Sequence, residues 1–216
     1  MVRGPKTTLS PDSLEYLANL APQDEVLARV ERETSEMPRS KMQVSPDQGA
    51  LLQVLVAAVG ATNALEVGTF TGYSAICIAR GLPEGGTLTC LELDDEYADI
   101  AQRNLEAAGV EDRVDIVRGP AGDSLKAMPE EPSYDFVFLD ADKSGYPDYY
   151  ELILPRMKPG ALLLIDNILM GGDVVDPEPG TSNEVVANLN AKIAEDERVD
   201  AAFAMVADGI AFVRKR

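Results

Sequence analysis

The chain has no histidine and no tryptophan, and it holds only two cysteines among 216 residues. Without histidine, acid–base and metal chemistry must rely on Asp, Glu, Lys, Tyr, Asn, Cys or a bound cofactor. Two cysteines exclude a disulfide scaffold, and 17 glycines without a period exclude a collagen-like chain. Cys77 and Cys90 each lie in an apolar run, so we expect both to be reduced core residues of a cytoplasmic protein.

Positive charge is also scarce, since 19 Lys and Arg face 37 Asp and Glu and the formal net charge is −18. A nucleic acid backbone would be repelled by such a chain, whose one basic run is the last three residues, 214–216. No apolar run approaches the roughly 18 residues that a membrane helix needs. The start, MVRGPKTTLSPDS, lacks the apolar core of a signal peptide. We therefore expect neither nucleic acid nor a membrane as a partner.

The residues that are present are typical of a globular chain, with 45% hydrophobic and 26% charged residues. This composition and length predict one domain over residues 1–216. Residues 1–43 are predicted to be a helical segment, because Ser10-Pro11-Asp12 is a helix-start signal and 24–36 is amphipathic. Residues 47–60 are apolar on most sides and predict a buried helix that opens a core over 44–216.

Beyond residue 60, strand and helix patterns alternate along the chain. We expect strands at 64–67, 87–93, 113–119, 134–141, 161–167, 200–207 and 210–215, and helices at 73–82, 95–109, 122–128, 147–157 and 183–197. The last two strands flank Asp208-Gly209, a tight-turn pair, and so predict a terminal antiparallel hairpin. The alternation predicts an α/β fold with a mostly parallel sheet and helices on both faces. Such sheets bind ligands at the carboxyl ends of their strands.

The first of these strands runs into a loop with two glycines, Gly68 and Gly72. Glycines let the backbone turn tightly and approach a ligand, although a plain turn is the alternative. The spacing G-x-x-x-G is not the G-x-G-x-x-G of dinucleotide folds, which weakens a pyrophosphate interpretation. Glu92 ends the second strand about 20 residues later, where an acid accepts hydrogen bonds from ribose in nucleotide folds. Loop and acid together favour a ligand that carries ribose.

Carboxylates also end the next two central strands, as Asp140-Ala141-Asp142 and as Asp166-Asn167. Carboxylate and amide oxygens suit Mg²⁺, or Ca²⁺ or Mn²⁺, rather than Zn²⁺. Two acids side by side repel each other unless a cation lies between them. We therefore interpret Asp140, Asp166 and Asn167 as a metal site. The alternative is that such acids cap the following helices, and we favour capping for Asp142 and Asp148.

Lys143 follows Asp140 by three positions and is the nitrogen base nearest to this predicted metal site. It is either a solvated surface lysine or a base for proton transfer. A free lysine has a pKa of about 10.4, and an adjacent divalent cation would disfavour its charged form.

Four motifs in order now resemble a known family. The strings are LEVGTFTGYS, LEL ending the second strand, YDFVFLDADKSGY, and LLLIDN followed by LMGGDVVDP. They resemble the cation-dependent O-methyltransferases, which use S-adenosylmethionine and include the caffeoyl-CoA and catechol O-methyltransferases. The likeness extends from about Met42 to the terminal DGIAFVRKR, and the DADK form favours the caffeoyl-CoA branch. It implies a seven-stranded, Rossmann-like methyltransferase sheet and a homodimer.

The resemblance also implies a role for each matching position. The residues that would bind the cofactor are Val44, Glu66, Gly68, Thr69, Ser74, Glu92, Ala121 and Asp140. Among these, Glu92 would bind the ribose and Ala121 would lie near the adenine. Asp140, Asp166 and Asn167 would ligate the metal, and Lys143 would be the general base.

The implied reaction is Mg²⁺-dependent transfer of a methyl group from S-adenosylmethionine to a phenolic hydroxyl of a catechol-like small molecule. The chain departs from the family where members often carry tryptophan, since Met170 and Ala141 stand there. Residues 1–43 match no motif and would shape the acceptor site or a dimer interface, so the identity of the acceptor stays open. Three alternatives also stay open. They are a nicotinamide-dependent oxidoreductase, a non-catalytic cofactor-binding protein, and methylation of a different atom or of a macromolecule.

Overall fold

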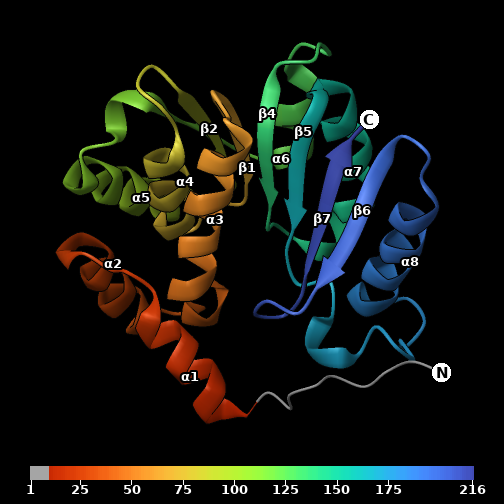
Figure 1. Ribbon diagram of the computed structural model, residues 1–216, viewed down its shortest axis with the longest axis horizontal. Coiled ribbons are helices and arrows are strands. Elements are labelled where there is room, and N and C mark those ends of the chain that lie inside the picture. Colours follow the sequence, from red (N-terminus) through yellow and green to blue (C-terminus); the bar gives the residue numbers. More distant parts are fainter. Residues whose placement is uncertain (1–9) are drawn as a thin grey trace.

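The computed structural model describes residues 10–216, and its centre is a seven-stranded sheet with the order β3-β2-β1-β4-β5-β7-β6 (Figure 1). The strands are β1 (Asn63–Val67), β2 (Thr87–Glu92), β3 (Val114–Arg118), β4 (Tyr134–Leu139), β5 (Met157–Ile165), β6 (Val199–Ala204) and β7 (Ile210–Lys215). Strands β1 to β5 are parallel, whereas β7 is antiparallel to both β5 and β6. The predicted α/β fold and its terminal antiparallel pair are confirmed.

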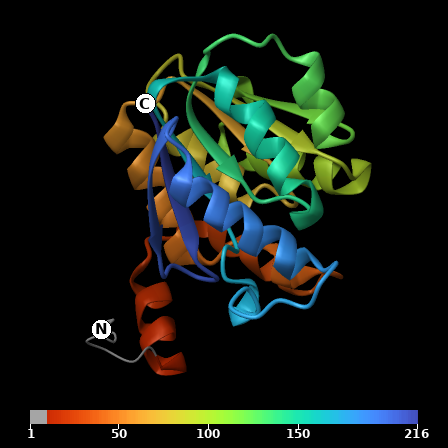
Figure 2. The same cartoon turned by 90° about the vertical axis from the view of Figure 1, so that its right-hand side faces the viewer.

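Helices cover both faces of the sheet (Figures 1 and 2). They are α1 (Pro11–Leu20), α2 (Glu25–Ser35), α3 (Pro46–Val59), α4 (Tyr73–Gly81), α5 (Asp95–Ala108), α6 (Ala121–Ala127), α7 (Tyr146–Ile153) and α8 (Ser182–Glu195). Side chains alternate along β4, so Phe136 packs with α3 and α4 while Val137 packs with α6 and α7. Each face therefore has its own hydrophobic core.

The helix ends follow signals that the sequence carries. The side chain of Ser10 accepts a hydrogen bond from the Ser13 amide and caps α1. Asp94 caps α5 in the same way, and Gly109 closes that helix in the left-handed conformation. Cys77 and Cys90 are buried and free, as predicted.

Three predicted boundaries are wrong by three residues or more. The strand expected over 161–167 is β5, which begins at Met157. The helix expected over 147–157 ends at Ile153, and a 3-10 turn over Leu154–Arg156 leads directly into β5. Pro155 lies in that turn and has no amide hydrogen for a continuing α-helix. The tight turn expected at Asp208-Gly209 is a longer loop over 205–209, in which Ala207 also has a positive φ of 47°. Strand β6 therefore stops earlier than the apolar pattern predicted.

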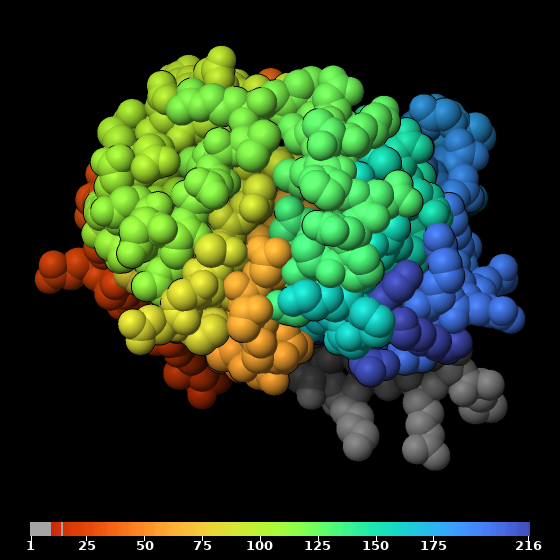
Figure 3. Space-filling view, turned by 90° about the horizontal axis from the view of Figure 1, so that it is seen from above, coloured from red at the N-terminus to blue at the C-terminus, as the bar shows by residue number. Residues whose placement is uncertain are grey.

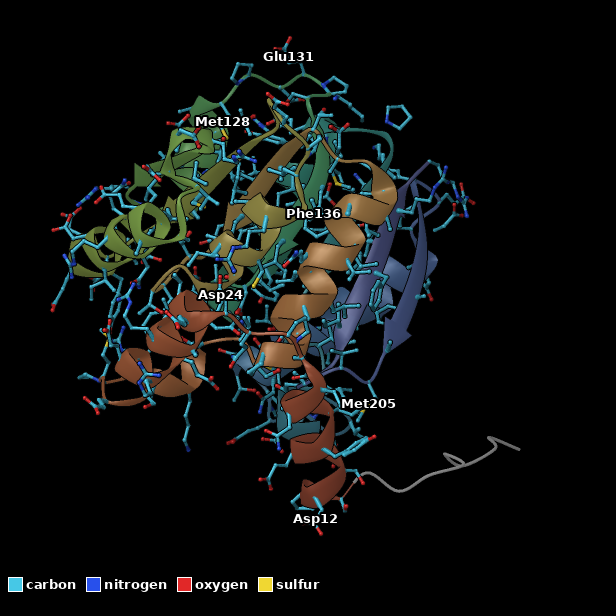
Figure 4. The ribbon with its side chains drawn as sticks, turned by 60° about the vertical axis from the view of Figure 1, so that its left-hand side comes forward. Asp12, Asp24, Met128, Glu131, Phe136 and Met205 are labelled. Atoms are coloured by element: carbon cyan, nitrogen blue, oxygen red, sulfur yellow. The ribbon has the colours of Figure 1, made fainter. Side chains whose placement is uncertain are left out.

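The N-terminal segment lies against the carboxyl ends of the strands. Helix α1 extends away from the sheet, with Asp12 labelled at its tip in Figure 4. Helix α2 packs beside α4 and α5, and the Thr34 hydroxyl donates to Thr71 Oγ1 at 3.0 Å. The first nine residues of the predicted helical segment 1–43 lie outside the described residues.

Seen from above, N-terminal residues (red) emerge at the left and the C-terminal strands (blue) lie at the right (Figure 3). None of the helices within residues 10–216 combines the length and the apolar character needed to cross a membrane.

Candidate functional site

The carboxyl ends of β1, β2, β4 and β5 open into one cavity of about 1110 Å³. The sheet order changes direction at β1, which has β2 on one side and β4 on the other, and ligands bind at such a switch point. The predicted site residues that line the cavity are Val44, Gly68, Thr69, Ser74, Glu92, Ala121, Asp140, Lys143, Asp166 and Asn167. The structure thus gathers ten of the eleven predicted residues around one space.

The glycine loop after β1 has no room for a side chain at its first glycine. Gly68 has a φ of 93°, and a Cβ there would overlap the carbonyl oxygen of Asp140. Gly72 has a φ of 88° and starts α4. Only glycine lets the loop backbone pass this close to the end of β4, because other residues avoid such φ values. The loop therefore brings backbone groups from β1 directly beside Asp140.

Glu92 shapes this loop as well as facing the cavity. Its Oε2 accepts hydrogen bonds from the amides of Thr69 at 3.1 Å and Phe70 at 2.7 Å, and its Oε1 accepts from Asp94 at 2.9 Å. The ring of Phe70 meets the ring of Tyr97 edge-on at 4.6 Å on the same side of the cavity. A carboxylate has about four lone-pair sites, so Glu92 can accept further bonds from a ligand. The loop-holding role of Glu92 was not foreseen from sequence.

Glu66 is the predicted cofactor residue that does not line the cavity. Its side chain is fully buried beneath the loop, where Cys90 Sγ donates to Oε2 at 3.4 Å. Burial raises the pKa of Glu66 to about 7, because the charged form loses its hydration. Within the described residues, Glu66 Oε1 and Thr69 Oγ1 are buried without a hydrogen-bond partner. Glu66 is therefore placed to act on the cavity through the loop.

Asp140 and Lys143 form a close ion pair at the end of β4. Lys143 Nζ donates to Asp140 Oδ1 at 2.7 Å and to the hydroxyl oxygen of Tyr146, also at 2.7 Å. The side chains of Lys143 and Asp140 are 19% and 16% exposed, so the cavity wall shields the pair from most solvent. Tyr146 was not identified from sequence, where it reads as one of three tyrosines on an apolar helix.

Asp166 is held by two donors at the end of β5. Gln48 Nε2 donates to Oδ2 at 2.8 Å, and the Asn167 amide donates to Oδ1 at 2.7 Å. Burial, and then the negative charge of Asp140, raise the pKa of Asp166 above its usual range. Gln48 also escaped the sequence analysis, although a glutamine in the first turn of an otherwise apolar helix was a usable signal.

The donor set at this edge is two carboxylates and one amide. Within residues 10–216, no group of three or more His, Cys, Asp or Glu side chains is arranged to hold a metal ion. Asp140, Asp166 and Asn167 line the same cavity, where burial first and the charge of Asp140 second disfavour the ionised form of Asp166. Hard oxygen donors in such a field fit a cation such as Mg²⁺. The residues present are therefore compatible with a divalent cation.

The rim of the cavity combines loops from both ends of the chain. Asp142 caps the 3-10 turn Lys143–Gly145 through the Gly145 amide, which confirms its predicted capping role, and Tyr149 donates to it at 2.6 Å. Met170 lines the rim where the family often has tryptophan, and Arg39, Lys41 and Met42 come from the N-terminal segment. Part of segment 1–43 thus forms cavity wall.

Three kinds of comparison with known proteins all find O-methyltransferases. The family model described as O-methyltransferase matches residues 18–216. A catechol O-methyltransferase from Niastella koreensis is 37% identical over 83% of this chain and 82% of that protein. Caffeoyl-CoA O-methyltransferase 1 from Zea mays is 33% identical over 98% of this chain and 88% of that protein. The crystal structure of an O-methyltransferase from Bacillus cereus in complex with SAH is 36% identical, with a TM-score of 0.85 and coverage of 94% of this chain and 96% of that chain.

Proposed function

Because the chain belongs to the O-methyltransferase family, we propose that it transfers a methyl group from S-adenosylmethionine to a phenolic hydroxyl of a catechol-like small molecule with the help of Mg²⁺. One observation carries this proposal. The glycine loop and Glu92 share a single cavity with Lys143 and the oxygen donors of β4 and β5. We call the side of the cavity at β1 and β2 the donor half, because it would bind the methyl donor, and the side at β4 and β5 the acceptor half. Since β4 lies beside β1 in the sheet, Asp140 at the end of β4 would lie between the two halves.

The donor half would bind the cofactor through groups left available at the cavity wall. S-adenosylmethionine, when bound, supplies an electrophilic methyl group on a positively charged sulfur. The carboxylates of Glu92 and Asp140 favour a positive ligand in a partly desolvated cavity. Thr69 lies on the loop that the cofactor would contact, and its buried Oγ1 has no hydrogen-bond partner at ordinary distance within the described residues, although it lies close to the Glu66 carboxyl. An orphaned polar atom at that place is consistent with a polar ligand.

The acceptor half would activate the hydroxyl. Asp140, Asp166 and Asn167 would hold a magnesium ion, which supplies Lewis acidity and lowers the pKa of a nearby hydroxyl. Lys143 Nζ, once it has released its own proton to solvent, would take the hydroxyl proton. The oxygen lone pair then forms the new O–CH₃ bond while the electrons of the S–CH₃ bond go to sulfur. The products are a methyl ether, a neutral thioether and a protonated lysine. Holding oxygen and methyl in contact contributes up to roughly 7–11 kcal/mol in well-oriented systems.

The competing interpretations are less well supported. A nicotinamide oxidoreductase would favour G-x-G-x-x-G, whereas this loop has glycines at 68 and 72. A non-catalytic binding protein would have no need of the Lys143–Asp140 pair beside Asp166. A macromolecular acceptor such as nucleic acid is disfavoured by the net charge of −18.

We also keep a homodimer in the proposal. Helix α1 exposes Tyr16, Leu17 and Leu20, whose side chains are 64%, 47% and 62% accessible. Apolar side chains gathered on a projecting helix are typical of a contact surface. Light scattering on the purified chain tests this, since a monomer at all concentrations would contradict it. The cytoplasmic location stays a prediction.

The deciding experiment follows labelled methyl transfer to a panel of catechols, caffeoyl esters and hydroxyanthranilates, with Mg²⁺ or with chelator. We expect methyl ethers from vicinal diols, loss of turnover in chelator and recovery on adding Mg²⁺. Product formation that is indifferent to chelator would remove the metal from the proposal. Calorimetric titration with S-adenosylmethionine and with NAD checks the donor independently, and binding of NAD alone would overturn the methyl donor.

A further inference from the structure

Tyr146 is a buried tyrosine whose hydroxyl lies beneath the candidate general base. Its side chain is 0% exposed and belongs to the hydrophobic core between the sheet and α7. Lys143 Nζ donates to the Tyr146 hydroxyl oxygen at 2.7 Å and lies 4.7 Å from the centre of the ring. A hydroxyl at this place is not needed to fill the core, because the ring alone provides the apolar volume. Its contact with Lys143 calls for a functional explanation.

The direction of this hydroxyl is set by two backbone carbonyls. The Tyr146 O–H donates toward the carbonyl oxygens of Leu139 and Asp166, each 3.3 Å away. These carbonyls end β4 and β5, next to the predicted metal ligands. The oxygen therefore presents a lone pair to Lys143 in a fixed direction.

A lysine that accepts a proton needs one nitrogen position aimed at the substrate. Its flexible stem can adopt many rotamers, so the nitrogen needs partners to hold it in one place. Here two of the three nitrogen substituent positions are taken, one by Asp140 and one by Tyr146. The third position is the one left to face a ligand, on a residue that lines the cavity. If the Asp140 carboxylate were to bind a cation and its contact with Lys143 weakened, Tyr146 would still hold the lysine nitrogen.

We propose that Tyr146 is a positioning residue that aims the Lys143 nitrogen at the acceptor hydroxyl. The inference rests on the proposed function, in which Lys143 takes the proton of that hydroxyl. It assigns to Tyr146 no contact with either substrate, so its effect falls on the rate of the chemical step.

The test replaces one oxygen, as Tyr146→Phe, in the full chain. We expect kcat for catechol to fall about tenfold to hundredfold, the usual effect of losing a supporting partner. The acceptor KM and the S-adenosylmethionine Kd should stay within about twofold, because Tyr146 touches neither ligand. A kcat equal to that of the wild type would overturn the proposal.

Tyr150→Phe is the matched control. Tyr150 is on the same helix, is also 0% exposed, and donates its hydroxyl to Asp196 at 2.9 Å, away from the cavity. This variant loses a buried hydroxyl and should show the accompanying loss of thermal stability with kcat retained. An equal fall of kcat in both variants would mean that any lost core hydroxyl slows turnover, and the assignment would be withdrawn.

A second readout separates positioning from a structural defect. Nitrocatechol has a hydroxyl that ionises near neutral pH and needs little help from a base. In Tyr146→Phe, the ratio of kcat for catechol to kcat for nitrocatechol should fall about tenfold below the wild-type ratio. This ratio is independent of the folded fraction, since both acceptors are measured on one preparation. An unchanged ratio would contradict the proposal even if the variant folds poorly.

A double-mutant cycle shows whether Tyr146 acts through Lys143. Tyr146→Phe added to Lys143→Met should cost little further activity, because the residue being positioned is already gone. Full additivity would show an independent role and overturn the inference. Wild-type protein that transfers no methyl group to any diol would instead overturn the proposed function, which distinguishes the two failures.

Discussion

Carboxyl groups at the cavity differ from those in a surface cluster of Glu151, Lys192, Asp196 and Arg198 beside α7 and α8, which we call the outer edge. The pKa values of the carboxyl groups are shifted in opposite directions in the two regions. Asp166 in the cavity wall and Glu66 just behind it are buried, and their pKa values are raised by loss of hydration. At the outer edge, hydrogen bonds from Arg198 and then Lys192 lower the pKa of Glu151 to about 2. The outer group is partly open to solvent and each charge has partners.

The difference teaches what each region is arranged to do. Carboxylates that are buried with too few donors cost stability, and they persist where a ligand or ion offsets the cost. Carboxylates that share an arginine at the surface contribute modestly to stability and have no need of a ligand. The buried carboxyl groups at the cavity would therefore gain from a cationic ligand, whereas the carboxylates of the outer edge are already paired with basic side chains.

The largest effect should follow from Asp166→Asn. This variant keeps the shape that Gln48 contacts but removes one charge from the predicted metal site. We expect Mg²⁺-stimulated turnover to fall by roughly a hundredfold or more, since a metal supplies several kcal/mol. Thermal stability at pH 8 should be equal or higher, because a poorly compensated buried charge is gone. Full turnover in the presence of chelator would refute the metal role and break the comparison.

Glu92→Gln should have the next largest effect, on cofactor affinity. A charged acceptor for ribose hydroxyls is worth about 1.5–3 kcal/mol, so the Kd for S-adenosylmethionine should rise about tenfold to hundredfold. Glu96→Gln, an exposed acid in the next helix, is the control and should bind normally. If calorimetry finds the same Kd for S-adenosylmethionine in Glu92→Gln and Glu96→Gln, Glu92 does not bind the cofactor and only holds the loop.

Glu66→Gln should change the pH dependence of stability. The folded-state pKa of Glu66 is about 7, above its ordinary 4.5, so folded protein retains a proton that unfolded protein has released. The free energy of unfolding must therefore decrease as pH rises from 4.5 to 7. The variant should flatten this decrease in urea titrations, leaving the contribution of Asp166. If the free energy of unfolding of the variant depends on pH as steeply as that of the wild type, Glu66 is not the source of this dependence.

The smallest effect should follow from Glu151→Gln at the outer edge. Its folded-state pKa is lowered, so its contribution is present above pH 4.5 and is lost as pH falls toward 2. Since the pair is partly exposed, we expect less than about 1 kcal/mol at neutral pH, reduced further by salt. Thermal unfolding at two pH values measures this, with methyl transfer unaffected. A change in turnover would show that the two regions are coupled.

The fold was predictable to a large extent because its signals are local. The alternation of apolar runs located all seven strands, and Ser10, Asp94 and Gly109 marked helix ends correctly. One error has a local cause, because Pro155 ends the helix early, whereas a neighbour in space decided where β5 begins. Strand β5 begins at Met157 because Tyr134 pairs with it, and no local pattern around Met157 shows this.

The candidate site was predictable as a set of residues, but its internal contacts were not. Strand-end acids and the glycine loop were recognisable, and the structure places ten of these residues on one cavity. Gln48 and Tyr146 were missed because their partners, Asp166 and Lys143, are identified only when α3, β5 and the start of α7 come together. Glu66 was grouped with the others, although the structure places it behind the cavity wall.

The order of strands and helices and the chemical types at each strand end follow from the amino-acid sequence alone, because these depend on neighbours along the chain. Only the tertiary structure decided which carboxylates are buried, which donors they receive and which hydroxyl holds the lysine. The Gln48–Asp166 contact joins segments 118 residues apart, whereas the Lys143–Tyr146 contact spans three residues and depends on how the turn between them folds and on the removal of water by packing.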